Sequence, residues 1–288
     1  MNARRRVDAL RQRGWRAAAD ARRVALRRGS ASSALESLGN PHRQPVADWN
    51  AATQDRHDAY RRAHDPATGS VAALCVSMRP HLLTRVVENL ERQAGVDVDV
   101  VFVANAPDFD LDAVDRALAP LANSRVVQAP PSTSLGAALN LGLDATDARF
   151  VAKIDDDDFY GPQYLSDALR AHRFAGAGVV GKHSYYAQIV DTANTYLRFP
   201  GNEFRYSSTL AGGTLVIDRD EVGEQRFDDI SLGEDRAFLA RCHRRGIATF
   251  SADRFNFTQE RGDANTWRLP VKDFLVDAIA ADGEEAFR

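Results

Sequence analysis

Four consecutive aspartates, Asp155 to Asp158, directly follow the mostly apolar run of residues 150–154. Unit charges about 4 Å apart repel each other by roughly 1 kcal/mol in water, and by more where solvent is excluded. A cation is therefore expected beside these carboxylates, and hard oxygen ligands select Mg²⁺, Mn²⁺ or Ca²⁺. Because ligands of open α/β sheets bind beyond the carboxyl ends of the strands, this position favours a cation that bridges carboxylate and diphosphate. The alternative is a solvated acidic loop, or a metal site that only stabilises the fold.

A second acidic pair, Glu234 and Asp235, opens an expected helix. At helical spacing Asp235 shares a face with the apolar residues three, four and seven positions further on, whereas Glu234 lies a step round toward Arg241. A carboxylate on that side faces a covered space, where it can act as a general base toward an acceptor hydroxyl. The alternative is that the two acids offset the helix dipole and cap free backbone amides.

The elements that must position these acids alternate between strand and helix patterns from Val71 onward. The expected strands cover residues 71–77, 98–103, 124–128 and 149–154, and the expected helices between them cover 81–93, 111–119 and 134–143. Such alternation predicts right-handed crossovers and a mainly parallel sheet. The later part is less regular. It is expected to contain a helix at 163–174, strand-like runs at 178–189 and 203–217, a helix at 234–245 and a last helix near 271–280.

Five short motifs follow one another in a fixed order. They are Cys75 to Pro80, Phe102 to Ala106, Leu135 to Gly142, Lys153 to Pro162, and the pair Glu234-Asp235. In this order, with about 80 residues between the two acidic elements, they resemble the family 2 inverting glycosyltransferases of the GT-A fold. The resemblance covers about residues 70–260. It implies a Rossmann-like, mainly parallel nucleotide-binding sheet flanked by helices, with a more irregular acceptor-side half.

The resemblance also implies an enzyme that moves a sugar from a nucleoside diphosphate sugar to a hydroxyl acceptor. Asp157 would hold Mg²⁺ or Mn²⁺ on the donor diphosphate, and Asp155 or Asp156 would contact the ribose or the transferred sugar. Asp235 would deprotonate the acceptor hydroxyl as it attacks the anomeric carbon from the opposite face, which inverts the configuration. Glu234 would orient nearby groups rather than act as the base.

Further donor-site residues follow from the same resemblance. The expected nucleotide-binding residues are Ser77, Arg79, Asn105, Gly136 and Asn140, together with Asp155 and Asp156. Many relatives carry an acid after the second strand to bind the base, where this chain has Ala104. Asn105 is the candidate substitute, because an amide both donates to and accepts from a base edge.

On the acceptor side, Gly212, Gly213 and Thr214 match the family's glycine stretch before a strand. Glycine would let the backbone approach a sugar closely, and the alternative is a bulge or a tight turn. Arg261 is a candidate bidentate donor to the diphosphate, and a surface salt bridge is its alternative.

Composition is that of a soluble, enzyme-sized chain of 288 residues with 44% hydrophobic content. The net charge of −3 conceals an asymmetry, because residues 1–30 carry ten arginines against two aspartates and leave the remainder near −11. Only two cysteines occur, which suggests no disulfide framework. No apolar run reaches the roughly 20 residues that span a bilayer, and the arginine-rich start lacks a signal peptide's hydrophobic stretch. A cytoplasmic protein is expected, with no nucleic-acid partner.

Five parts are expected along the chain. They are a basic amphipathic helix at 1–29, a connecting segment at 30–68, a donor half at 69–160, an acceptor half at 161–260 and a C-terminal helical tail at 261–288. The basic helix could lie on an anionic membrane surface, dock on a partner or pack on its own domain. The family's habit and this arm together suggest a carbohydrate or glycolipid acceptor in the cell envelope.

Two other functions are compatible with the acidic motifs. A sugar nucleotidyltransferase also needs aspartates and Mg²⁺, but it usually bears a glycine-rich basic loop after the first strand, where this chain has only Ser77-Met78-Arg79-Pro80. A non-catalytic module that binds a nucleotide sugar or a metal needs no base at Asp235.

Overall fold

The computed structural model describes residues 55, 57–59, 61–62, 69–130, 132–262, 265, 269–281 and 283. The expected basic helix at 1–29 and nearly all of the connecting segment at 30–68 lie outside the described residues. The chain divides into two units, 1–56 and 57–288, and the architecture below is that of the second unit. None of the helices in its described part is long and apolar enough to cross a membrane.

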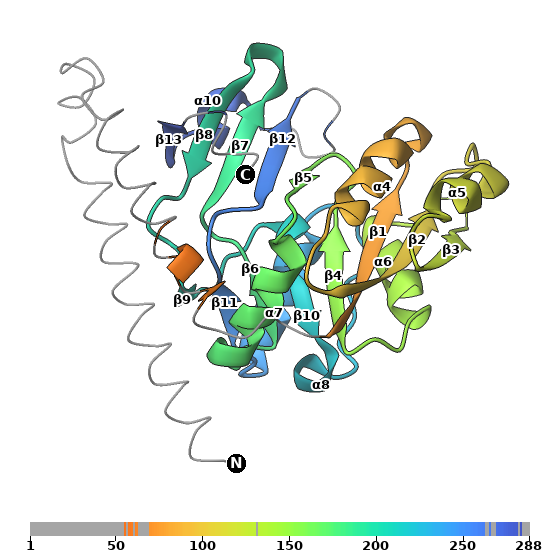
Figure 1. The fold of residues 1–288 in the computed structure, drawn as a ribbon, viewed down its shortest axis with the longest axis horizontal. Helices are drawn as coiled ribbons and strands as arrows, with labels where there is room; N and C mark the ends of the chain where they lie inside the picture. The colour runs from red at the N-terminus through yellow and green to blue at the C-terminus, as the bar shows by residue number, and fades with distance from the viewer. Residues whose placement is uncertain are drawn as a thin grey trace. The chain divides into compact units, whose positions relative to one another are not determined.

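An eight-stranded sheet forms the centre of this unit (Figure 1). Its first half holds four strands, β3 (Asn123–Gln128), β2 (Asp97–Ala104), β1 (Ser70–Ser77) and β4 (Phe150–Ile154), in that order. All three pairings among them are parallel. Each strand agrees with an expected one to within a residue or two. The predicted α/β fold with a mainly parallel nucleotide-binding sheet is confirmed.

The other half of the large sheet is mixed. It continues from β4 through β10 (Val216–Asp218), β6 (Val179–Gly181), β11 (Thr249–Ser251) and β9 (Arg205–Tyr206). Strand β10 runs antiparallel to both of its neighbours, β4 and β6. This insertion places the glycine turn that precedes β10 beside the carboxyl end of β4.

Helices cover both faces of the large sheet. They are α4 (Leu83–Glu91) after the 3₁₀ turn η1 (Pro80–Leu82), α5 (Leu111–Leu118), α6 (Leu135–Asp144), α7 (Tyr164–Ala175), α8 (Arg219–Val222) and α9 (Glu234–Arg244). One apolar cluster joins α4, α5 and α7 to the sheet, and another joins α6 and α9 to the opposite face. Residues of β1 alternate between the two clusters, as expected for a strand that is buried on both faces.

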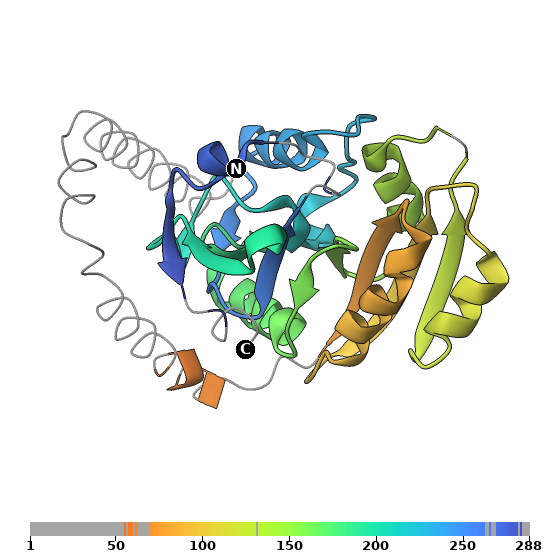
Figure 2. The same cartoon turned by 90° about the horizontal axis from the view of Figure 1, so that it is seen from above.

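A second sheet of five strands was not expected from the sequence. Its order is β13 (Ala278–Ala281), β8 (Asn194–Arg198), β7 (Tyr185–Ile189), β12 (Phe257–Arg261) and β5 (Phe159–Tyr160). In Figure 2 its outer strands lie on the left, whereas β1 and β2 lie on the right. The expected run at 178–189 thus divides into β6 and β7, which belong to different sheets. The run at 203–217 contains β9, the 3₁₀ turn η3 (Gly212–Thr214) and the start of β10.

The C-terminal helical tail was predicted wrongly. Helix α10 covers only Val271–Phe274, and β13 follows it where the predicted helix at 271–280 should continue. Strand β13 pairs antiparallel with β8, which is distant in sequence. That pairing satisfies the backbone at Ala278–Ala281, so a tertiary contact overrides the helical preference of alanine.

Candidate active site

The four aspartates lie at the carboxyl end of β4 and alternate in exposure. The Asp155 and Asp157 side chains are 33% and 21% exposed, whereas that of Asp156 is 4% exposed and Asp158 is buried. These residues lie in the turn between β4 and β5, so the fold of this turn rather than strand alternation sets their exposure. The more exposed pair is therefore Asp155 and Asp157.

The two inward aspartates are engaged by the protein. Asp156 accepts hydrogen bonds from Ser77 Oγ at 2.5 Å and from Arg79 Nε at 3.2 Å. Asp158 accepts one from the Glu260 backbone amide at 3.1 Å. Burial, followed by the charges of Asp157 and Asp155, raises the pKa of Asp158 well above its usual range. These contacts hold the segment of four aspartates against β1 and β12.

Two basic side chains, those of Arg79 and Lys153, lie beside the four aspartates. Arg79 Nη1 is 2.9 Å from Asp157 Oδ2, and Lys153 Nζ is 2.5 Å from Asp155 Oδ1. Burial alone would lower the pKa of Lys153, but Asp155, Glu234 and Asp235 outweigh it and raise that pKa. The expected positive charge beside the aspartates is thus supplied in part by the chain itself.

Asp157 has further partners that sequence reasoning missed. Its Oδ2 accepts a hydrogen bond from Asn265 Nδ2 at 2.8 Å, and its backbone carbonyl accepts one from Arg85 Nη1 at 3.0 Å. Burial and then the charge of Asp155 raise the pKa of Asp157. Neither Asn265 nor Arg85 lies in a recognisable motif, so only the fold reveals them.

Gly212 and Gly213 lie directly between the two acidic elements. A Cβ atom on Gly212 would be 2.1 Å from Asp235 Oδ2, and one on Gly213 would be 2.7 Å from Asp155 Oδ2. A side chain at either position would displace the carboxylate that it meets, so glycine permits this close approach. The Tyr160 hydroxyl accepts a hydrogen bond from the Asp155 amide at 2.8 Å and donates one to the Gly213 carbonyl at 2.7 Å.

Gly212 and Gly213 lie in a tight turn. A bulge or a tight turn was the alternative expected from the sequence for this stretch. Thr214 is buried, and its hydroxyl donates to the Ala211 carbonyl at 2.7 Å and accepts from the Lys182 amide at 2.9 Å. The Thr214 side chain therefore closes the turn. The glycines themselves form the surface against Asp155 and Asp235.

Glu234 and Asp235 start α9 as expected. The sequence predicted that Asp235 would lie on the apolar side of this helix, but Glu234 is the more buried of the two. Glu234 is only 5% exposed, whereas Asp235 is partly exposed. Burial raises the pKa of Glu234, and the nearby Lys153 opposes that shift.

The predicted donor-side residues divide into two groups. The Asn105 backbone N–H donates to the Ser77 carbonyl at 2.8 Å, which places Asn105 at the same sheet edge as the aspartates. Asn140 instead exchanges two 2.9 Å hydrogen bonds with the Phe227 backbone. A Cβ on Gly136 would be 1.8 Å from the Asp228 carbonyl oxygen. Gly136 and Asn140 thus hold the loop that precedes α9.

Arg261 is buried, which contradicts the alternative of a surface salt bridge. Its Nη2 donates to the Leu269 carbonyl at 3.2 Å, and its guanidinium lies 5.4 Å from the Phe274 ring centroid. Burial and the neighbouring Arg198 lower the pKa of Arg261, while Asp157 acts in the opposite direction. Arg261 therefore interacts electrostatically with Asp157. Its contact with the diphosphate stays a prediction.

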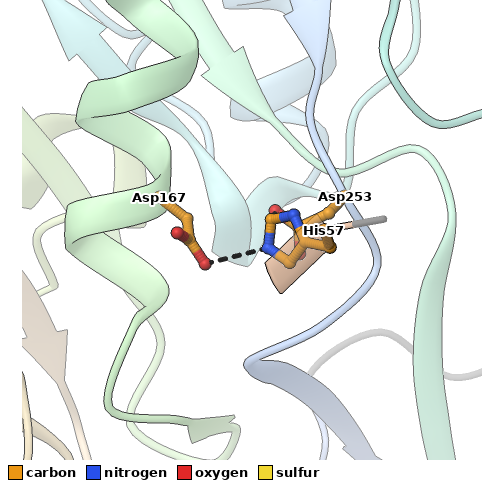
Figure 3. Close-up of side chains that lie close together, drawn as sticks. All are labelled: His57, Asp167 and Asp253. Atoms are coloured by element: carbon orange, nitrogen blue, oxygen red, sulfur yellow. Dashed lines mark hydrogen bonds and ion pairs between the residues drawn. The ribbon is translucent and has the colours of Figure 1, made fainter. Parts of the chain in front are cut away.

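A second group of ionisable side chains lies apart from the four aspartates. His57 lies beside Asp167 and Asp253 (Figure 3), with His57 Nε2 3.2 Å from Asp167 Oδ2 and 3.7 Å from Asp253 Oδ2. Ligand types and spacing alone would suit a metal. However, Asp167 also accepts from Arg170 Nη1 at 2.8 Å, and Asp253 accepts from Lys182 Nζ at 3.1 Å. Because cations already compensate both carboxylates, this group fits a structural charge network.

Replacing Asp167 by Asn is expected to destabilise the protein by about 3 kcal/mol at neutral pH, because it leaves buried cations without their partner. Burial would raise the pKa of Asp167, but hydrogen bonds from His57 and Arg61 lower it well below the usual range. A carboxylate with a lowered folded-state pKa contributes stability above its unfolded pKa, near 4, and loses it as pH falls. The difference from wild type should therefore shrink below about pH 4.

Urea unfolding at a series of pH values measures this effect. Asp144→Asn is the control, since Asp144 pairs with Arg226 at 2.9 Å on the surface. Exposed pairs contribute about 0–1 kcal/mol, so the control should stay close to wild type. A loss in Asp167→Asn that is the same at pH 3 and pH 7 would contradict the charge network.

Comparison with known proteins adds three findings. The model of the glycosyl transferase family 2 matches residues 73–224. A mannosyltransferase from Pyrobaculum calidifontis, PcManGT, solved with GDP-Man and Mn²⁺, superposes with a TM-score of 0.56 at 14% identity, covering 70% of this chain and 59% of that one. Residues 1–349 of S. aureus TarS, solved with UDP-GlcNAc, give a TM-score of 0.53 at 17% identity, covering 72% of this chain and 63% of that one. This chain thus spans less than two thirds of either structure. A search of curated proteins found no match.

Proposed function

Since this chain belongs to glycosyl transferase family 2, we propose that it is a metal-dependent inverting enzyme that moves a sugar from a nucleoside diphosphate sugar to a hydroxyl acceptor. The GT-A fold inferred from the sequence is confirmed by the structural neighbours. The observation that carries the proposal is the placement of outward-facing Asp155 and of Asp235 on either side of Gly212-Gly213. The proposed donor-side residue Asp155 and the proposed base Asp235 therefore lie against the same short segment.

The donor set fits a hard divalent cation. Asp157 is partly exposed, and burial and the neighbouring Asp155 raise its pKa. A carboxylate whose charge is disfavoured in this way gains from a bound cation, and oxygen ligands suit Mg²⁺ or Mn²⁺. The structure of PcManGT contains Mn²⁺, which supports this assignment. When bound by Asp157, the ion would offset negative charge on the leaving nucleoside diphosphate.

Asp155 is the better candidate for contact with the ribose or the transferred sugar. Asp156 is buried and engaged by Ser77 and Arg79, so its role is to fix the loop on β1. Asp155 is one-third exposed and lies against Gly213. A carboxylate exposed to this degree can accept hydrogen bonds from sugar hydroxyls.

Asp235 is proposed as the general base. The acceptor oxygen attacks the anomeric carbon, its proton passes to the Asp235 carboxylate, and the bond from that carbon to the diphosphate oxygen breaks. Attack opposite the leaving group inverts the configuration. Glu234 is buried beside Asp235 and orients the groups around it. The nearby glycine turn lets the Asp235 carboxylate lie directly against the backbone.

The first test is calorimetric titration of UDP, GDP, dTDP and UTP into the protein, with Mn²⁺ and then with EDTA. We expect metal-dependent binding of one nucleoside diphosphate, which would also identify the base of the donor. The neighbours were solved with GDP-Man and UDP-GlcNAc, so GDP and UDP are the first nucleotides to try. Preference for the triphosphate, or no binding of any nucleotide, would contradict the proposal.

The acceptor is proposed to be a carbohydrate or glycolipid of the cell envelope, reached by a cytoplasmic enzyme at the inner membrane face. The ten arginines among residues 1–30 support this location, because basic segments bind anionic lipid surfaces. Deleting residues 1–29 is expected to abolish sedimentation with vesicles that contain anionic lipid. Binding of the full chain should weaken as salt rises. Unchanged sedimentation of the truncated protein would contradict the membrane role.

A further inference from the structure

Asn265 follows β12 and contacts the proposed metal ligand Asp157, although 108 positions separate the two residues in the sequence. Its Nδ2 donates to Asp157 Oδ2 at 2.8 Å and to the Glu260 carbonyl at 3.0 Å. Its Oδ1 accepts from the Gly262 backbone N–H at 2.6 Å. A carboxamide nitrogen has two N–H donors, and each of them has an acceptor here. Contacts at both ends therefore fix the orientation of the Asn265 carboxamide.

Glu260, at the end of β12, is itself attached to the segment of four aspartates. Its backbone N–H donates to Asp158 Oδ1 at 3.1 Å, and its carboxylate pairs with Arg85. Arg85 Nη1 in turn donates to the Asp157 carbonyl at 3.0 Å. The residue on which Asn265 is supported is thus bound to the same segment that Asn265 contacts.

The Asp157 carboxylate is held by one of its two oxygens. Asn265 Nδ2 and Arg79 Nη1 both contact Oδ2, at 2.8 and 2.9 Å. Among the described residues, none makes a hydrogen bond or an ion pair with Oδ1. Two donors on one oxygen oppose rotation of the carboxylate. Because the Asp157 side chain is 21% exposed, a cation can reach it, and Oδ1 is the oxygen that remains for this ion.

We propose that Asn265 is a positioning residue of the metal site: it holds Asp157 Oδ2 so that Asp157 binds the cation through Oδ1 alone, which favours Mg²⁺ over Ca²⁺. The inference rests on the proposed function, in which Asp157 is the metal ligand. Mg²⁺ requires nearly octahedral coordination, whereas Ca²⁺ accepts carboxylates that bind through one or both oxygens. A carboxylate limited to one oxygen therefore suits Mg²⁺. Asn265 lies beyond residues 73–224, which match the family model, so family membership does not assign it this role.

The test compares Asn265→Ala with the wild type by calorimetric titration of UDP and GDP in Mg²⁺, in Mn²⁺, in Ca²⁺ and in EDTA. Asn202→Ala is the matched control, because Asn202 is also a partly exposed asparagine whose side chain joins two parts of a loop. Its Nδ2 donates to the Phe199 carbonyl at 2.9 Å, and its Oδ1 accepts from Arg205 Nη1 at 3.3 Å. Thermal unfolding of each preparation verifies that the variants are folded.

For Asn265→Ala we expect diphosphate affinity in Mg²⁺ and in Mn²⁺ to fall about 10- to 100-fold, the usual effect of losing a partner that orients a metal ligand. Affinity in Ca²⁺ should fall less than about threefold, because a carboxylate that is free to rotate can bind Ca²⁺ through both oxygens. Affinity in EDTA should stay within about twofold of wild type, because the effect of Asn265 requires the ion. Asn202→Ala should match the wild type in all four titrations.

Three results would overturn the inference. The first is unchanged affinity of Asn265→Ala in Mg²⁺ and Mn²⁺. The second is an equal loss in Mg²⁺ and Ca²⁺, which would show that Asn265 does not select the ion. The third is an equal loss in EDTA, which would show that Asn265 only supports the fold of the donor site.

A double variant tests whether Asn265 acts through Asp157. Asn265→Ala added to Asp157→Asn should weaken diphosphate binding in Mg²⁺ by less than about twofold, because residues that act as one unit are not additive. A further loss of about tenfold in the double variant would contradict the inference, because independent sites add in this way.

The wild type is a test even where Asn265→Ala does not fold. With Asp157 held by one oxygen, the wild type should bind its diphosphate at least about tenfold more tightly in Mg²⁺ than in Ca²⁺. Equal affinity in the two ions would contradict the role of Asn265. Failure of the proposed function is distinct from these results. In that case the wild type binds no nucleoside diphosphate with any of the three ions, and the inference falls with it.

Discussion

Asp235→Asn is expected to lower the rate of sugar transfer by about 10²- to 10⁴-fold while metal-dependent nucleotide binding stays close to wild type. The amide has nearly the same shape as the carboxylate, but it cannot take the acceptor's proton, and general-base catalysis contributes a factor of this size. Asp235 lies against Gly212 at the start of α9, away from the contacts that hold Asp156 and Asp157. Its loss should therefore leave the donor side intact.

Transfer rates and calorimetric nucleotide affinity, measured on the same preparation, separate these two effects. Asp229→Asn is a suitable control, because Asp229 precedes α9 in the same loop and contacts Ser134 at 2.6 Å. Its activity should stay within a few-fold of wild type. Full transfer activity in Asp235→Asn would contradict the assignment of the base. Loss of nucleotide binding in the same variant would show that Asp235 acts on the donor.

Asp157→Asn is expected to remove the metal-dependent part of nucleotide affinity. The substitution replaces a charged ligand by a neutral amide, and an amide oxygen is a weaker ligand for a hard cation. We expect the variant in Mn²⁺ to bind the diphosphate like the wild type in EDTA. The loss should be at least tenfold, which corresponds to about 1.4 kcal/mol.

The same titration contains its own controls. The interactions of Asp157 with Arg79 and Asn265 are on one oxygen, and an asparagine oxygen can still accept from both. The variant should therefore remain folded, which thermal unfolding verifies. Asp156→Asn should instead lower stability, because Asp156 is buried between Ser77 and Arg79. Unchanged metal-dependent affinity in Asp157→Asn would contradict the metal assignment.

The donor half of the fold could be predicted because its signals are local. Strands β1, β2 and β4 are buried on both faces and read as short apolar runs between helices of clear period. Helices α5 and α6 also carry their own start signals. Asp110 and Ser134 each accept a hydrogen bond from a backbone amide of the first turn, at 3.1 Å.

The second sheet could not be predicted in the same way. Strands β7 and β8 are consecutive, but β12 pairs with β7 and β13 pairs with β8 across long stretches of sequence. Short segments such as Ala278–Ala281 have no periodicity that separates strand from helix. Their conformation depends on which backbone lies alongside, and that is decided by the folded arrangement.

For the site, the sequence alone determined that two acidic elements exist, that one follows a buried strand and that the other opens a helix. Only the tertiary structure decided which aspartates face outward, because a run of four identical residues contains no pattern. It also decided that Lys153 pairs with Asp155, and that Gly212 lies against Asp235 and Gly213 against Asp155. The physical reason is that these contacts join β4, η3 and α9, whose positions are set by sheet pairing and helix packing rather than by local composition.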